Sequence, residues 1–155
     1  MKRGVGVFLA VTLVPAWLGA TTGTAQAGAG PCWIVSGEAN VAIEYVENPF
    51  GTPGDLGVFH GTANVSVNHP ECKMVLTAVF STSESSGRCL PTGAGADPSC
   101  AGATGRFTQT PNDDTRIKVV ATVQGVDKRQ RQVNDTATCS MIVHFYPSSL
   151  GCALQ

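Results

Sequence analysis

Charged residues are scarce in this chain, and those present nearly balance. Asp, Glu, Lys and Arg make up 14% of the 155 residues. Eight basic and eleven acidic residues follow residue 27, which gives that part of the chain a formal charge of about −3. A field this weak, and of negative sign, does not attract a polyanion from a distance. We therefore expect no nucleic-acid partner.

Long apolar runs are also missing, apart from one at the N-terminus. Lys2 and Arg3 precede an apolar run over residues 5–20, and Ala25-Gln26-Ala27 then supplies small residues. This order is typical of a signal peptide that is cleaved after residue 27. We expect residues 28–155 to form a single secreted domain, extracellular or periplasmic, with no membrane span in the mature chain.

Helical periodicity is absent, because apolar spacings of three and four are never sustained and Gly or Pro interrupts the longer gaps. Apolar and polar residues instead alternate with a period of two, as half-buried antiparallel strands require. The alternation is clear in residues 41–45, 59–68, 73–81, 116–124 and 136–145, and weaker in residues 33–36 and 106–110. The sequence therefore predicts an all-β, antiparallel two-sheet sandwich of about seven strands.

The predicted sandwich is immunoglobulin-like in kind, since it holds two cysteines, Cys72 and Cys139, that lie 67 positions apart. Immunoglobulin domains place a Trp between their two cysteines, whereas Trp33 precedes both cysteines here. We therefore assign the chain to no family.

Unpaired cysteines are not expected, because the chain holds six cysteines and export delivers them to an oxidising compartment. Disulfide bonding removes thiolates as nucleophiles and as metal ligands. In the period-two alternation, Cys72 and Cys139 fall at positions that face the core, which favours a buried bridge between them. The remaining bridges of the predicted scheme are Cys89–Cys100 and Cys32–Cys152. Six cysteines allow about 15 pairings, so this scheme is one of several.

Motifs for catalysis or metal binding are missing as well. No Gly-x-Ser-x-Gly elbow is present, and oxidised cysteines leave no free thiol to act with a His. The candidate metal ligands lack the spacing of a local zinc site or of a calcium loop, so we expect no metal and no cofactor. These candidates are His60, His69, Glu71, Asp113, Asp114 and His144.

Two segments are candidate contact surfaces. Residues 81–105 contain almost no large apolar side chain, which predicts a long loop, and a Cys89–Cys100 bridge would hold this loop ready for binding. Its candidate contact residues are Arg88, Leu90 and Pro91. The second segment is the only basic cluster, which consists of Lys128, Arg129 and Arg131 at the expected turn between the last two strong strands. It would suit an acidic polymer or an anionic surface.

These features favour a secreted or envelope-associated binding domain without catalytic activity. Its ligand would be a protein or polymer outside the cytoplasm. One alternative is a secreted protease inhibitor that presents Arg88 or Leu90 to the protease. A small secreted hydrolase is the least favoured alternative, because two carboxylates can meet in space from any positions in the sequence.

Overall fold

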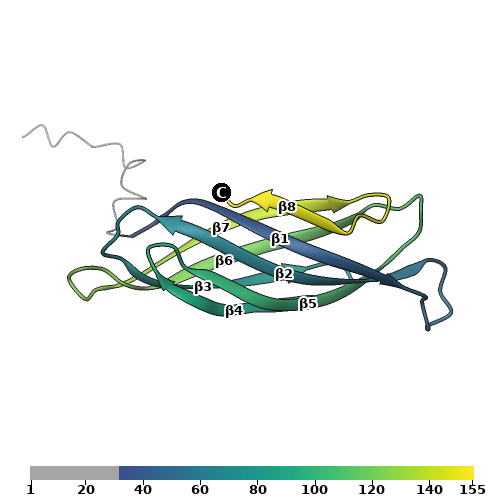
Figure 1. The fold of residues 1–155 in the computed structure, drawn as a ribbon, viewed down its shortest axis with the longest axis horizontal. Helices are drawn as coiled ribbons and strands as arrows, with labels where there is room; N and C mark the ends of the chain where they lie inside the picture. The colour runs from purple at the N-terminus through teal and green to yellow at the C-terminus, as the bar shows by residue number, and fades with distance from the viewer. Residues whose placement is uncertain (1–31) are drawn as a thin grey trace, which may run out of the picture.

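The computed structural model describes residues 32–155, which form eight antiparallel β-strands around one core (Figure 1). The strands are β1 (Ile34–Val46), β2 (Asp55–Val67), β3 (Lys73–Ser81), β4 (Ser86–Gly95), β5 (Ser99–Gln109), β6 (Thr115–Val126), β7 (Gln132–Val143) and β8 (Ser149–Ala153). The described residues include no helix that is long and apolar enough to cross a membrane. The expected signal peptide, residues 1–27, lies outside the described residues.

All eight strands belong to one hydrogen-bonded order, β7-β6-β3-β4-β5-β2-β1-β8. The outermost strands meet along a seam, where the backbones of Thr138 and Gln155 exchange two hydrogen bonds of 2.8 and 3.1 Å. The disulfide Cys139–Cys152 crosses the same seam. Beyond the end of β8, the carboxylate of Asp135 accepts the backbone N–H of Ile34 at 2.8 Å. The strands therefore form a nearly closed barrel.

Consecutive strands run in opposite directions, so their connections gather at the two ends of the barrel (Figure 1). The β2–β3, β4–β5 and β6–β7 connections lie at the left of the figure, and we call this the β6–β7 end. The β1–β2, β3–β4, β5–β6 and β7–β8 connections lie at the right, and we call this the β1–β2 end.

The barrel interior is filled by alternate residues of each strand, as the period of two predicts. On β3 and β6 the inward side chains are 1% exposed or less; they are Met74, Leu76, Ala78, Phe80, Ile117, Val119, Ala121 and Val123. Two buried phenylalanines lie opposite glycines in the β2–β5 ladder, Phe59 facing Gly105 and Phe107 facing Gly57. A Cβ on Gly105 would lie 2.3 Å from Cζ of Phe59, and a Cβ on Gly57 would lie 2.5 Å from Cζ of Phe107. The missing side chains leave the space that the rings occupy.

The antiparallel all-β class is confirmed, but a nearly closed barrel replaces the predicted two-sheet sandwich. The difference arises in residues 81–105, where the sequence predicted a long loop. This segment forms β4 and the first part of β5, which join β3 to β2 in one hydrogen-bonded order. Its strands escaped detection because their buried positions are cysteines and small residues, such as Cys89, Cys100 and Ala103, so no alternation of large apolar side chains marks them.

The bridge Cys89–Cys100 forms as predicted and links β4 to β5, but the other two predicted bridges are wrong. The structure pairs Cys32 with Cys72 and Cys139 with Cys152. Strand register explains both errors. Cys139 is level with Phe80 through the β7–β6–β3 ladder, so it lies eight residues, or about 26 Å, along β3 from Cys72. Cys152 is level with Ala39, so it is similarly far along β1 from Cys32.

A buried polar network closes the β1–β2 end. The side-chain amide of Gln109, which is 1% exposed, donates to the C=O groups of Asp113 and Val143 at 2.9 and 2.8 Å. Its Oε1 accepts the hydroxyl of Tyr45, and its own C=O accepts the hydroxyl of Tyr146, each at 2.9 Å. The two tyrosine rings meet edge to face with their centroids 4.6 Å apart. Burial, with the charge of Tyr146 as a second cause, raises the pKa of Tyr45 to about 12.

Candidate anion-binding pocket

A pocket of about 250 Å³ opens at the β6–β7 end, and we call it the tip pocket. It lies between the β6–β7 turn, the β2–β3 connection and the residues that precede β1. Its lining residues are Cys32, His69, Glu71, Cys72, Asp127, Lys128, Arg129 and Arg131. The pocket therefore combines cationic, acidic and disulfide-bonded side chains in a small volume.

The β6–β7 turn supplies four of these lining residues. Val126 pairs with Gln132 across the ladder, so residues 127–131 form the connection. The backbone N–H of Asp127 donates to the C=O of Arg131 at 3.0 Å, and the N–H of Gln130 donates to the C=O of Asp127 at 2.9 Å. Gln130 takes a left-handed conformation, with φ at 61°, which lets the chain reverse within this short turn.

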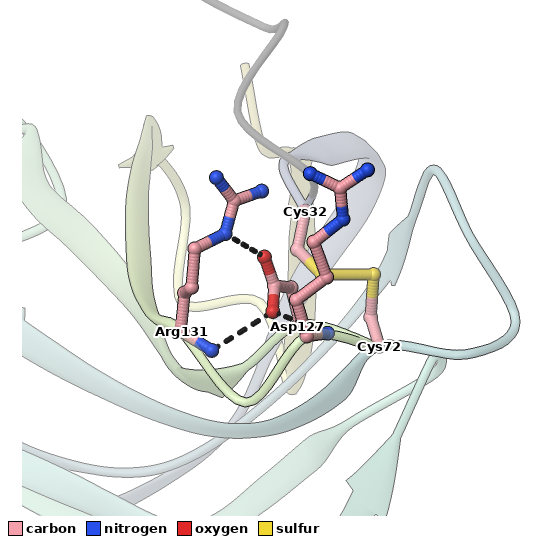
Figure 2. A network of polar contacts seen from close by, with 5 residues as sticks. Cys32, Cys72, Asp127 and Arg131 are labelled. Carbon is pink, nitrogen blue, oxygen red and sulfur yellow. Dashed lines mark hydrogen bonds and ion pairs between the residues drawn. A yellow bond between two sulfur atoms is a disulfide. The ribbon is translucent and has the colours of Figure 1, made fainter.

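Asp127 organises the turn from within. Its side chain is 1% exposed, and one carboxylate oxygen accepts the backbone N–H groups of Arg129 and Arg131 at 2.7 and 2.9 Å. The other oxygen accepts Nε of Arg131 at 2.7 Å (Figure 2). Burial alone would raise the pKa of Asp127. The hydrogen bonds from Arg131 and Arg129 and the charge of Arg131 together outweigh this effect, so the pKa of Asp127 lies below its ordinary value. The carboxylate therefore stays ionised and holds Arg131 in place.

The cations around the pocket differ in how far they are neutralised. Lys128 lies 3.7 Å from a carboxylate oxygen of Glu71, but both side chains are more than 60% exposed, and such pairs are weak. Nε of Arg131 donates to Asp127, and the terminal N–H₂ groups of Arg131 donate to no residue between positions 32 and 155. Arg129 forms no ion pair with any residue between positions 32 and 155. Leaving His69 aside, three cations and two carboxylates give the lining one net positive charge.

One wall of the tip pocket is the disulfide Cys32–Cys72 (Figure 2). The two cysteines are buried, 4% and 2% exposed, and both line the pocket. Backbone bonds bring them together, because Trp33 accepts the N–H of Asn68 at 3.1 Å and donates its own N–H to the Asn68 side chain at 2.8 Å. The start of β1 is thus fixed to the β2–β3 connection.

The basic cluster predicted from the sequence lies on the β6–β7 turn, at the position expected for it. The structure brings its three residues together around the tip pocket. The other candidate contact residues are elsewhere, on the exposed face of β4. Arg88 pairs with Val79 of β3, and Leu90 pairs with Ala101 of β5, so this segment is part of the sheet and is not a free loop.

The candidate metal ligands are spread over the molecule. His69 and Glu71 line the tip pocket, whereas His60 lies on the exposed face of β2. His144 pairs with Asp114 at the β1–β2 end. Within residues 32–155, no three His, Cys, Asp or Glu side chains come close enough to hold a metal ion.

Sequence reasoning missed the buried carboxylate and the disulfide wall of the pocket. Asp127 directly precedes the basic cluster, and an Asp at the start of a turn commonly bonds the backbone two residues later, as Asp127 does with Arg129. The role of Asp127 could therefore have been predicted. The disulfide wall could not, because the alternation of apolar and polar residues does not show which cysteines pair. No protein-family model, curated protein or solved structure matched this chain, so its function is argued from the site itself.

Proposed function

We propose that this chain is a secreted, non-catalytic binding domain that engages an anionic group of its partner in the tip pocket. The partner is a protein or polymer outside the cytoplasm that carries carboxylate, phosphate or sulfate groups. The three disulfides are typical of extracellular proteins, which agrees with this setting.

The observation that carries the proposal is the contrast between two arginines at one pocket. Arg131 is held by the buried Asp127, while Arg129 has no acidic partner among the described residues. A guanidinium that is already fixed loses little side-chain entropy when a ligand binds. A second guanidinium, which no acidic residue between positions 32 and 155 neutralises, supplies further positive charge. Together they suit an oxyanion that accepts several N–H groups.

Recognition here depends on close contact and not on long-range attraction, because residues 28–155 carry a formal charge of about −3. An anionic partner gains favourable interaction only when it reaches the β6–β7 end. This arrangement favours selective binding over general adhesion to polyanions.

The proposal is tested by measuring binding of the oxidised protein to dextran sulfate, with uncharged dextran of equal length as the reference. Arg129→Gln removes the unpaired guanidinium, and Lys118→Gln removes the same charge from the outer face of β6, near the β3–β4 turn. Loss of one charge-assisted contact, about 1.5 kcal/mol, corresponds to about tenfold weaker binding. We expect this loss for Arg129→Gln and less than twofold weakening for Lys118→Gln. Equal weakening by both variants, or equal binding of the two dextrans, contradicts the proposal.

A further inference from the structure

The tip pocket places a disulfide beside cations. Cys32–Cys72 forms its wall, and the cationic side chains Lys128, Arg129 and Arg131 line the same cavity. Positive charge has two effects on disulfide chemistry. It attracts a negatively charged thiol reagent, and it stabilises the thiolate that leaves when the bond breaks.

The other two disulfides lie in different surroundings. Cys89–Cys100 is inside the barrel, with its cysteines 0% and 2% exposed, and the strands β4 and β5 cover it. Cys139–Cys152 is partly exposed at the seam, and the shallow hollow that contains Cys152 is also lined by Glu38. Cys89–Cys100 therefore lies inside the barrel, and Cys139–Cys152 is partly exposed beside a carboxylate. Cys32–Cys72 is as buried as Cys89–Cys100, but it lines a pocket that also contains cations.

We propose that Cys32–Cys72 is a site of thiol–disulfide exchange for small thiols that carry a carboxylate. The reagent thiolate attacks one sulfur of the disulfide, the Cys32–Cys72 bond breaks, and the other cysteine leaves as a thiolate next to the cations. A second reagent thiolate then attacks the mixed disulfide, releases the oxidised reagent and leaves both cysteines reduced. The two reagent thiols supply the two electrons, and water supplies the protons that the cysteine thiolates take up.

Reduction at this position is a local change in the fold. Cys32 precedes β1 and Cys72 precedes β3, so neither lies within the strand ladders that hold the barrel. The β1–β2 ladder still begins at the Ile34 pair with Val67, and the seam keeps its own disulfide. Reduction therefore separates the start of β1 from the β2–β3 connection and removes one wall of the tip pocket.

The test uses three small thiols of similar size: mercaptoacetate, which is negative, 2-mercaptoethanol, which is neutral, and cysteamine, which is positive. The oxidised protein is exposed to each thiol without denaturant, new thiols are alkylated, and peptide mapping gives a rate for each disulfide. The readout is the rate at Cys32–Cys72 divided by the rate at Cys139–Cys152, because the intrinsic reactivity of each reagent cancels in this ratio.

We expect the ratio to be largest with mercaptoacetate and smallest with cysteamine, about threefold to tenfold apart at low salt, and to converge at high salt. Arg129→Gln lowers the ratio for mercaptoacetate, whereas Lys118→Gln, which makes the same charge change on the far part of β6, leaves it unchanged. A ratio that ignores reagent charge, or one that is largest with cysteamine, overturns the inference. So does opening of Cys32–Cys72 only together with loss of the far-ultraviolet signal of the folded barrel.

The inference uses the charge and the disulfide of the tip pocket and does not require the partner proposed above. A normal charge series together with no binding of dextran sulfate removes the proposed function alone. A flat charge series together with selective binding removes this inference alone.

Discussion

Replacing Gly105 with alanine destabilises the barrel, because the site of the new methyl group is already occupied. The Cβ would lie 2.3 Å from Cζ and 2.5 Å from Cε1 of Phe59, far inside normal contact distance. Phe59 is 0% exposed and packs against Phe80 with ring centroids 6.4 Å apart, so its ring has no free space to enter. Overpacking of this kind costs about 1–3 kcal/mol.

The matched control for this substitution is Gly93→Ala. Gly93 is on β4 of the same hairpin, and its Cβ would meet the hydroxyl of Ser99 at 2.9 Å and the Ser99 nitrogen at an ordinary contact distance of 3.9 Å; the hydroxyl can rotate away. At a compatible position, Gly→Ala stabilises by about 0.4–1 kcal/mol through the unfolded chain. A domain of roughly 120 residues changes its Tm by about 4 °C for each 1 kcal/mol. We therefore expect Gly105→Ala to lower the Tm by about 4–12 °C and Gly93→Ala to leave it unchanged or slightly higher.

The assay is calorimetry and urea unfolding of the disulfide-bonded protein. A second substitution sharpens the assay, because Phe59→Leu removes the ring that the new methyl group meets. Gly105→Ala should then cost less in the Phe59→Leu background than in the original protein. Equal Tm values for Gly105→Ala and Gly93→Ala, or a cost at Gly105 that is the same in both backgrounds, would refute the reasoning about ring and glycine.

Two further predictions concern the barrel ends and the seam. Because Tyr45 has a pKa of about 12 in the folded protein against 10 for an ordinary tyrosine, its contribution to stability is complete below pH 10 and is lost as the pH rises to 12. Absorbance of tyrosinate should appear at higher pH in the native than in the unfolded protein, and Tyr45→Phe should flatten the fall in stability over that range; coincident titration curves would contradict this. Asp135→Ala removes the acceptor of the Ile34 N–H, so hydrogen exchange at Ile34 should accelerate while the amide of Thr138 stays protected. Unchanged exchange at Ile34 would show that Asp135 does not close the seam.

The sequence predicted those strands whose interior positions carry large apolar side chains. The alternation on β3 and β6 is regular, and every one of its inward residues is buried. The β4–β5 hairpin could not be found in the same way, because small residues stand where large ones would mark an inward face. Gly105, for example, leaves its space to the ring of Phe59 on β2. Phe59 is far away in the chain, and a period of two cannot reveal such a partner.

For the disulfides too, the sequence predicted local features but not those that depend on how distant strands pair. The alternating pattern correctly predicted that Cys72 faces the interior, where it is 2% exposed. The pattern does not say how far along a strand a residue lies, and the register of three strands placed Cys139 far from Cys72. Only the bridge Cys89–Cys100, whose partners belong to one hairpin, could be predicted from sequence spacing.

The candidate site was half predictable. A run of basic residues at a turn is visible in the sequence, and the structure places Lys128, Arg129 and Arg131 there. What makes the turn a pocket is the β2–β3 connection with the Cys32–Cys72 bridge, which comes from a different part of the chain. The buried Asp127 holds the side chain of Arg131, whereas Arg129 pairs with no acidic side chain of residues 32–155, and this distinction depends on side-chain geometry.

The central claim is that the tip pocket receives an anionic group, and the most direct test is a titration of the isotope-labelled, oxidised protein with inorganic phosphate, followed by nuclear magnetic resonance of the backbone amides. We expect saturable shifts for residues 127–131 and for the lining residues His69, Glu71 and Cys72, with the β1–β2 end unaffected. The same titration of Arg129→Gln should give smaller shifts at those positions. Shifts that centre on the β1–β2 end, or that fail to saturate anywhere, would show that the tip pocket does not bind an anion.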